Sequence, residues 1–180
     1  MRSNVASLGR LGDDAEIVRR ERHDVIRQIE ASVRTAWLPV ELDISLGHSV
    51  FRTCGLAGYL EYCRQAILES TRGPLLGPIR SALMRVGLGP AHALKRLPAG
   101  WDLIYRGAGQ LVLEGTPKDG RGTMVLRGLP LAMRDNVYLR GIAASLDGVL
   151  IVTGGHATRS ELTLSGDEAH FELSWSSNDG

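Results

Sequence analysis

Five histidines and two cysteines are the residue types in this sequence that most often do chemistry. The histidines stand at positions 23, 48, 92, 156 and 170, and no two of them have the close spacing of paired metal ligands. Cys54 and Cys63 are nine residues apart, so within one helix they would point to opposite sides and could not bind one metal ion. The sequence therefore predicts no metal site, and we expect both cysteines to be small core or interface residues.

Nucleophilic catalysis requires a serine, cysteine or threonine beside a positioned base, and the chain has no Gly-x-Ser-x-Gly elbow. We therefore expect a protein that is not an enzyme. The alternative is a small hydrolytic enzyme whose titratable groups gather in three dimensions. The candidates for such a cluster are His156, His170, Asp135 and Glu114.

Haem is the cofactor that a single histidine could hold, because one axial ligand is enough to anchor the iron. The candidate ligands are His48, His92 and His156. None of them falls in a recognisable motif, so we expect no cofactor and keep a haem or gas sensor as an alternative.

The middle of the chain is basic, whereas the last twenty residues carry only acidic charges. Such asymmetry favours an acidic protein partner, or head-to-tail contact between copies in a homodimer. Nucleic acid is a weaker interpretation, because aromatic residues make up only 5% of the chain and no helix-turn-helix pattern stands out. The predicted basic partner face consists of Arg64, Arg72, Arg80, Arg85 and Arg96.

The composition is that of one compact domain. The 180 residues are 43% hydrophobic and 23% charged, with a formal net charge of +1, which excludes disordered and collagen-like classes. No apolar run is long enough to span a membrane, and no signal-peptide core precedes the charged residues near the N-terminus, so we expect a cytoplasmic protein. We predict a flexible tail at 1–12, one domain at 13–176 and a short tail at 177–180.

The first half of this domain has helical periodicity. Apolar residues at roughly helical spacing predict a helix over 14–36, and Leu56, Leu60, Cys63 and Ile67 predict a second between Ser45 and about Thr71. A third helix is expected over 76–86, and a short fourth begins at Pro90, which suits a first helical position.

After Pro98 the periodicity changes to two. Alternation over 101–105, 110–114 and 123–127, with a Pro117-Lys-Asp-Gly120 turn, predicts a three-strand antiparallel meander. A long helix to about Thr153 follows; the alternative is a shorter helix and then a strand at 148–153. A C-terminal hairpin turns at Ser165-Gly-Asp167. The fold class is therefore α+β, with helices packed on a twisted antiparallel sheet.

Large apolar and aromatic residues line ligand pockets in proteins. If an apolar small molecule lies between the helices and the sheet, we expect six large residues to surround it. These residues are equally suited to a plain core. They are Phe51, Leu56, Tyr59, Leu60, Trp101 and Tyr105.

The order of glycine, proline and apolar positions resembles a family of paralogues of similar length from social deltaproteobacteria. The positions are Leu46-Gly47, Gly58-Tyr59, Pro74-Leu-Leu76, Gly89-Pro90, Leu97-Pro98, Gly141 and the terminal Phe171-Glu-Leu-Ser-Trp175. That family in turn is similar to the superfold of haem-NO-binding domains, vinyl-reductase-like sensor domains and the Bet-type subunits of vesicle-tethering complexes.

This resemblance implies a helical layer on a twisted antiparallel sheet, often dimeric, and sensing, binding or scaffolding rather than turnover. No ligand residue of those families transfers, because the chain has no cysteine after Cys63 and no histidine in a matching motif. We therefore expect a non-catalytic binding, signalling or scaffold module that self-associates and holds an apolar ligand between helices and sheet.

Overall fold

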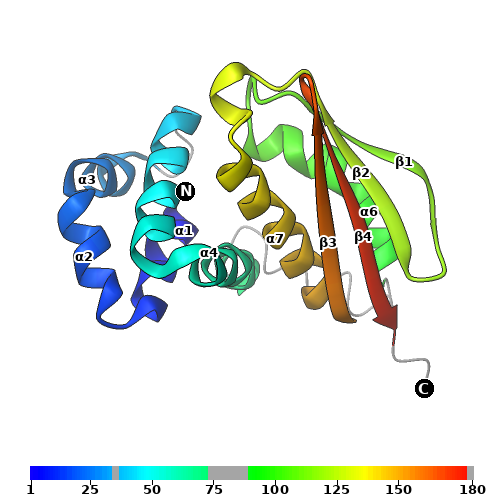
Figure 1. Ribbon diagram of the computed structural model, residues 1–180, viewed down its shortest axis with the longest axis horizontal. Coiled ribbons are helices and arrows are strands. Elements are labelled where there is room, and N and C mark those ends of the chain that lie inside the picture. Colours follow the sequence, from blue (N-terminus) through cyan, green and yellow to red (C-terminus); the bar gives the residue numbers. More distant parts are fainter. Residues whose placement is uncertain (34–36, 73–88, 178–180) are drawn as a thin grey trace.

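The computed structural model describes residues 1–33, 37–72 and 89–177 and has the predicted α+β architecture (Figure 1). Helices fill the first half of the chain, and a four-stranded antiparallel sheet with two covering helices fills the second half. None of the helices in the described ranges is both long enough and apolar enough to span a bilayer.

The predicted N-terminal tail is wrong, because residues 1–12 are folded. They form α1 (Arg2–Ser7) and the 3₁₀ turn η1 (Leu8–Leu11), and they bury Val5 and Leu8 against the neighbouring helices. The predicted helix over 14–36 is also corrected, since a break at Arg22 separates α2 (Asp14–Glu21) from α3 (His23–Ala31). Of the predicted apolar stripe, Val18, Val25 and Ile29 are buried, whereas Val33 is 69% exposed.

The helix α4 (Val40–Arg72) is longer than predicted and bends once. Gly55 has φ of 69° and ψ of −178° in the middle of the helix, a conformation that favours glycine because it has no Cβ. α4 packs on the preceding helices on both sides of the bend, since Val50 and Tyr62 both belong to the hydrophobic cluster shared with α1 to α3. We call these four helices with η1 the helical lobe. The predicted third helix over 76–86 lies outside the described residues.

The fourth helix, α6 (Pro90–Ile104), takes the place of the first strand of the predicted meander. Pro90 occupies its first turn as expected, but the helix continues through Pro98 and includes residues 101–104, so no strand forms there. Trp101 and Tyr105 are four residues apart, and their rings stack with centroids 4.2 Å apart. The spacing that suggested alternation is therefore also the spacing of one helical turn.

The sheet has the strand order β1-β2-β4-β3 and is antiparallel throughout. One hairpin joins β1 (Gln110–Lys118) to β2 (Arg121–Arg127), and the other joins β3 (Gly155–Ser165) to β4 (Glu168–Ser177). Both predicted turns are confirmed: Asp119, Gly120 and Gly166 have positive φ there.

After the short 3₁₀ turn η2 (Leu131–Met133), the helix α7 (Asn136–Val152) confirms the favoured interpretation of residues 134–153. It packs under β3 and β4, while α6 packs under β1, and we call these elements the α/β lobe. Figure 1 shows α7 between α4 and the sheet. Two hydrophobic clusters result, one in each lobe, and α4 contributes to both.

Candidate functional site

A buried carboxylate lies where the two lobes meet. Asp43, in the first turn of α4, is 8% exposed. Its Oδ1 accepts a hydrogen bond of 2.5 Å from the Nδ2 of Asn4 in α1, and its Oδ2 accepts one of 3.2 Å from the hydroxyl of Tyr138 in α7. A buried charge is costly unless it is hydrogen-bonded, so this carboxylate ties three helices to one arrangement.

Two further tyrosines surround this carboxylate. The Tyr62 hydroxyl donates to the backbone oxygen of Asn4 at 2.9 Å, and Tyr105 lies beside Tyr138. Burial, together with the negative charge of Asp43, raises the pKa of Tyr62, Tyr105 and Tyr138. All three therefore remain neutral hydroxyls that can donate hydrogen bonds. We call Asn4, Asp43, Tyr62, Tyr105 and Tyr138 the lobe seam.

Beside the lobe seam, α4 and α7 approach closely at Gly141. Tyr59 of α4 is 1% exposed, and a side chain at Gly141 would collide with its ring and approach the Cys63 Sγ. Burial raises the pKa of the Cys63 thiol to about 12, so the thiol stays protonated and is unsuited to act as a nucleophile.

A histidine and a carboxylate pair at the start of α7. The Asp135 Oδ1 is 2.9 Å from the Nε2 of His48 and accepts a hydrogen bond of 2.7 Å from the Tyr138 backbone N–H. Asp135 therefore caps α7 while holding α4. A histidine paired with a carboxylate is part of many hydrolytic sites, but in the described residues no hydroxyl or thiol is bonded to the His48 ring.

A second buried carboxylate, Asp147, lies in α7 between α4 and β3. Its Oδ2 accepts a hydrogen bond of 3.1 Å from the Ser160 hydroxyl and is 3.7 Å from Arg64 Nη2, whereas its Oδ1 is buried without a partner. Burial raises the pKa of this carboxyl, and the bonds from Ser160 and Arg64 oppose that shift. The unpartnered oxygen makes the charged form costly.

The six predicted ligand-pocket residues are divided between the two lobes. Phe51, Tyr59 and Leu60 belong to the cluster of the helical lobe, while Trp101 and Tyr105 pack in the α/β lobe. Leu56 is 39% exposed beside the bend of α4. Within the described ranges these residues do not surround one shared cavity.

The predicted basic face is also dispersed as far as the structure describes it. Arg64 pairs with Glu61 and approaches Asp147, and Arg96 is exposed on α6. Arg80 and Arg85 lie outside the described residues, as does the side chain of Arg72.

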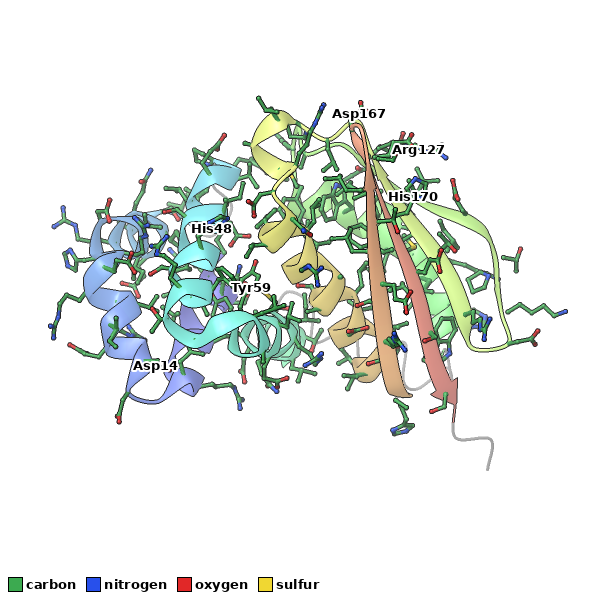
Figure 2. The ribbon with its side chains drawn as sticks, viewed as in Figure 1. Asp14, His48, Tyr59, Arg127, Asp167 and His170 are labelled. Carbon is green, nitrogen blue, oxygen red and sulfur yellow. The ribbon has the colours of Figure 1, made fainter. Side chains whose placement is uncertain are left out.

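The four candidates for a catalytic cluster do not all converge: Glu114 and His170 are linked on the sheet through Arg127 and Glu168, whereas Asp135 pairs with His48 and His156 lies apart. Figure 2 shows His48 on α4, away from Arg127 and His170 on the sheet. His170 lies 3.5 Å from Glu168, and Arg127 pairs with Glu114 and Glu168, all on the sheet. His156 is exposed at the start of β3. No group of three or more histidine, cysteine or acidic side chains that could hold a metal ion occurs in the described part of the chain.

The lobe seam was not predicted from the sequence. Asp43 and Tyr138 are 95 residues apart, so no local pattern connects them. The one available signal was Asp135 three residues before Tyr138, the spacing of an N-terminal helix cap.

No protein-family model matches this chain, and no curated protein matches it. Solved structures do match. One is a crystal structure of an oxygen-binding H-NOX domain related to soluble guanylate cyclases, in its oxygen complex. It has a TM-score of 0.63 and 13% identity over 96% of this chain and 91% of that chain.

Two other solved structures match at comparable levels. One, from work on modulating haem redox potential through protein-induced porphyrin distortion, has a TM-score of 0.61 and 13% identity over 96% of this chain and 95% of that chain. The other is an unliganded Fe(II) H-NOX protein variant from K. algicida. It has a TM-score of 0.56 and 10% identity over 99% of this chain and 98% of that chain. The predicted distant resemblance to the haem-NO-binding fold is therefore confirmed.

Proposed function

We propose that this chain is a non-catalytic sensor or signalling module in which a displacement of the helical lobe is transmitted to the α/β lobe. The observation that carries the proposal is Asp43, whose two carboxylate oxygens accept hydrogen bonds from different elements, α1 in the helical lobe and α7 in the α/β lobe. The likeness to H-NOX domains supports a sensor fold.

Other relative positions of the two lobes would disrupt the hydrogen bonds of Asp43. Apolar contacts tolerate small sliding movements, but a buried carboxylate that loses a donor bears a desolvation cost of about 1 to 3 kcal/mol. The lobe seam therefore favours discrete relative positions of α4 and α7 over a continuum. A ligand or partner that displaces either lobe has to break the bond between Asp43 and Tyr138, and this transmits the displacement.

Hydrogen exchange tests this coupling. In the Tyr138→Phe variant the ring remains but the donor to Asp43 is lost. We expect faster amide exchange not only in α7 but also in α1 and in residues 40–54 of α4, because Asp43 and Asn4 lose their shared anchor. The measurement is exchange detected by mass spectrometry, compared peptide by peptide with the wild-type chain.

The matched control is Arg140→Ala, also on α7. Arg140 is exposed and donates a hydrogen bond to the Asn136 side chain within the same helix. Its removal should leave exchange in the helical lobe unchanged. If Tyr138→Phe changes exchange in the α/β lobe alone, the proposed coupling is wrong.

A haem or gas sensor is the second candidate, and the solved haem-protein structures favour it. The described residues do not fit a haem, because none of the histidines is a free axial ligand facing an apolar space. His48 is bonded to Asp135, His170 is 3.5 Å from a carboxylate on the sheet, and the other three are exposed: His23, His92 and His156. The close approach of Tyr59 and Gly141 further fills the region between α4 and α7.

Titration of the purified chain with haemin, followed by absorption spectroscopy, separates the two candidates. We expect no stoichiometric change of the Soret band. A sharp endpoint at one haemin per chain would favour the haem sensor.

Native mass spectrometry of freshly purified protein tests the predicted apolar ligand. A copurified mass of the size of a lipid would support that ligand. The acidic partner and the cytoplasmic location stay predictions.

A further inference from the structure

The two edges of the sheet differ in how they are protected against pairing with another strand. Along β1 the pairing with β2 shifts between Glu114 and Lys118, where Gly115 has positive φ and Pro117 interrupts the donors. Such irregularities and prolines are the usual means of blocking an edge. The other edge strand, β3, has its single irregularity near its start, at Ala157.

After that bulge, β3 pairs regularly with β4 from Arg159 to Ser165, and this stretch contains neither proline nor lysine. Within the described part of the chain, β4 is the single strand neighbour of β3. Most of the strand is exposed. Its outer backbone groups thus form a regular edge to which another antiparallel strand can bond.

The charges beside this edge are not balanced, because two carboxylates lie opposite each other on neighbouring strands. On the sheet face turned away from α6 and α7, Glu161 stands directly opposite Glu172, and Glu172 stands opposite Thr123. Carboxylates directly opposite each other on neighbouring strands repel. The neighbouring cation is Arg159, which pairs with Glu161 of the same strand at 2.8 Å, and its side chain is 75% exposed.

We propose that the β3 edge is the surface through which two copies of this chain self-associate, in antiparallel register centred on Ser160. Ser160 is the midpoint of β3 (Gly155–Ser165), so the two strands overlap along their whole length, and residues 159–161 of each copy pair within the regular stretch of the other. It places Arg159 opposite Glu161 of the second copy, and Glu161 opposite Arg159 of that copy. In each copy, the cross-strand pair of Glu172 and Glu161 then continues into Arg159 of the other copy.

Neighbouring registers lack this match. A two-fold axis perpendicular to the sheet has to pass through a residue, because opposed side chains must lie on the same face. Centred on Glu161, the register would oppose two identical carboxylates, and centred on Leu162, it would place Glu161 opposite Thr163. The charge pattern therefore selects Ser160. In this register residues 162–165 of each copy lie opposite the bulged start of the other strand, so regular pairing is confined to residues 159–161 and the dimer is weak and concentration-dependent.

Charge reversal and charge exchange test the register. We expect the wild-type chain to show a monomer–dimer equilibrium in sedimentation velocity over a concentration series. Arg159→Glu should weaken association by roughly tenfold or more, because it replaces two symmetry-related attractive pairs with repulsive ones. The double variant Arg159→Glu with Glu161→Arg exchanges the charges and should restore the wild-type affinity to within about threefold.

The matched control is Lys118→Glu, which makes the same change of charge at an exposed position of the β1–β2 hairpin. It should associate like the wild type, and circular dichroism should show all variants folded, since the altered side chains are exposed. A monomeric wild-type chain, an unaffected Arg159→Glu variant or a double variant that fails to recover would each overturn the proposal. None of these results bears on the exchange test of lobe coupling, so the two proposals fail separately.

Discussion

Gly141 of α7 faces Tyr59 of α4 so closely that a single added carbon would collide with the tyrosine. The Cβ of an alanine at Gly141 would overlap the Tyr59 hydroxyl, lie 2.7 Å from its Cζ and stand 3.0 Å from the Cys63 Sγ. Because Tyr59 is almost completely buried, its ring has little room to move aside. Glycine at this position is what allows the two lobes to share an interface.

The Gly141→Ala variant should therefore be destabilised. Alanine has the better helix propensity, by roughly 0.8 to 1 kcal/mol. Overpacking at a rigid site costs about 1 to 3 kcal/mol, so we expect a net loss. Equilibrium unfolding in urea measures the difference.

Gly100→Ala is the control for that experiment. Gly100 also lies inside a helix, α6, but nothing stands within 4 Å of its added Cβ, so alanine should raise stability there. Equal effects at both positions would mean that the contact between Tyr59 and Gly141 does not limit the packing of α4 on α7.

We expect two substitutions at Asp43 in the lobe seam to lower the free energy of unfolding by different amounts. Asp43→Ala leaves the Asn4 amide and the Tyr138 hydroxyl without an acceptor, and we expect a loss of about 2 to 4 kcal/mol in the free energy of unfolding. Asp43→Asn keeps one side-chain oxygen as an acceptor, so its loss should be smaller. Thermal unfolding followed by circular dichroism ranks the two variants, and the reverse order would contradict this account of the seam.

At the start of α7, two roles of Asp135 can be separated. Asp135→Ala removes both the helix cap and the partner of His48, and it should cost about 1 to 2 kcal/mol. Asp135→Ser keeps a capping oxygen on a shorter side chain while abolishing the hydrogen bond to His48. We expect the serine variant to recover most of the loss in urea unfolding, since the side chains of His48 and Asp135 are about one-third exposed. Equal losses would show that the bond to His48 dominates.

The sequence predicted the parts of the fold that depend on neighbouring residues. The turns at Asp119-Gly120 and at Gly166 were predicted because few residue types adopt positive φ. α6 was misassigned after Pro98, since proline usually ends a helix, yet this helix continues through it and Trp101 stays in the same apolar stripe as Leu94.

The lobe seam and the register of the β3 edge depend instead on distant residues. Asn4, Asp43 and Tyr138 are polar residues in three separate helices, and each alone is typical of a helix surface. The burial of Asp43 and Tyr138 follows from how α1 and α7 pack on α4, which a pattern of apolar positions does not specify. Likewise, the expected pocket residues are divided between two cores because Phe51, Tyr59 and Leu60 lie on α4, whereas Trp101 and Tyr105 lie in and just after α6.

The pH dependence of stability should reveal Asp147. Because burial raises the pKa of this carboxyl in the folded chain, the folded state binds the proton more tightly than the unfolded state does. The charged form therefore lowers stability at neutral pH, and this penalty is relieved as the pH falls through the raised folded pKa toward the ordinary value.

The Asp147→Asn variant lacks that titration but keeps an oxygen that can accept the bond from Ser160. Its free energy of unfolding should match or exceed that of the wild type at about pH 7, and the difference should shift toward the wild type at about pH 4. Urea unfolding at both pH values measures this change. Arg64 keeps Glu61 as a partner in the variant, so no unpaired buried cation obscures the result. A difference between the two proteins that stays constant with pH would show that Asp147 does not titrate differently on folding.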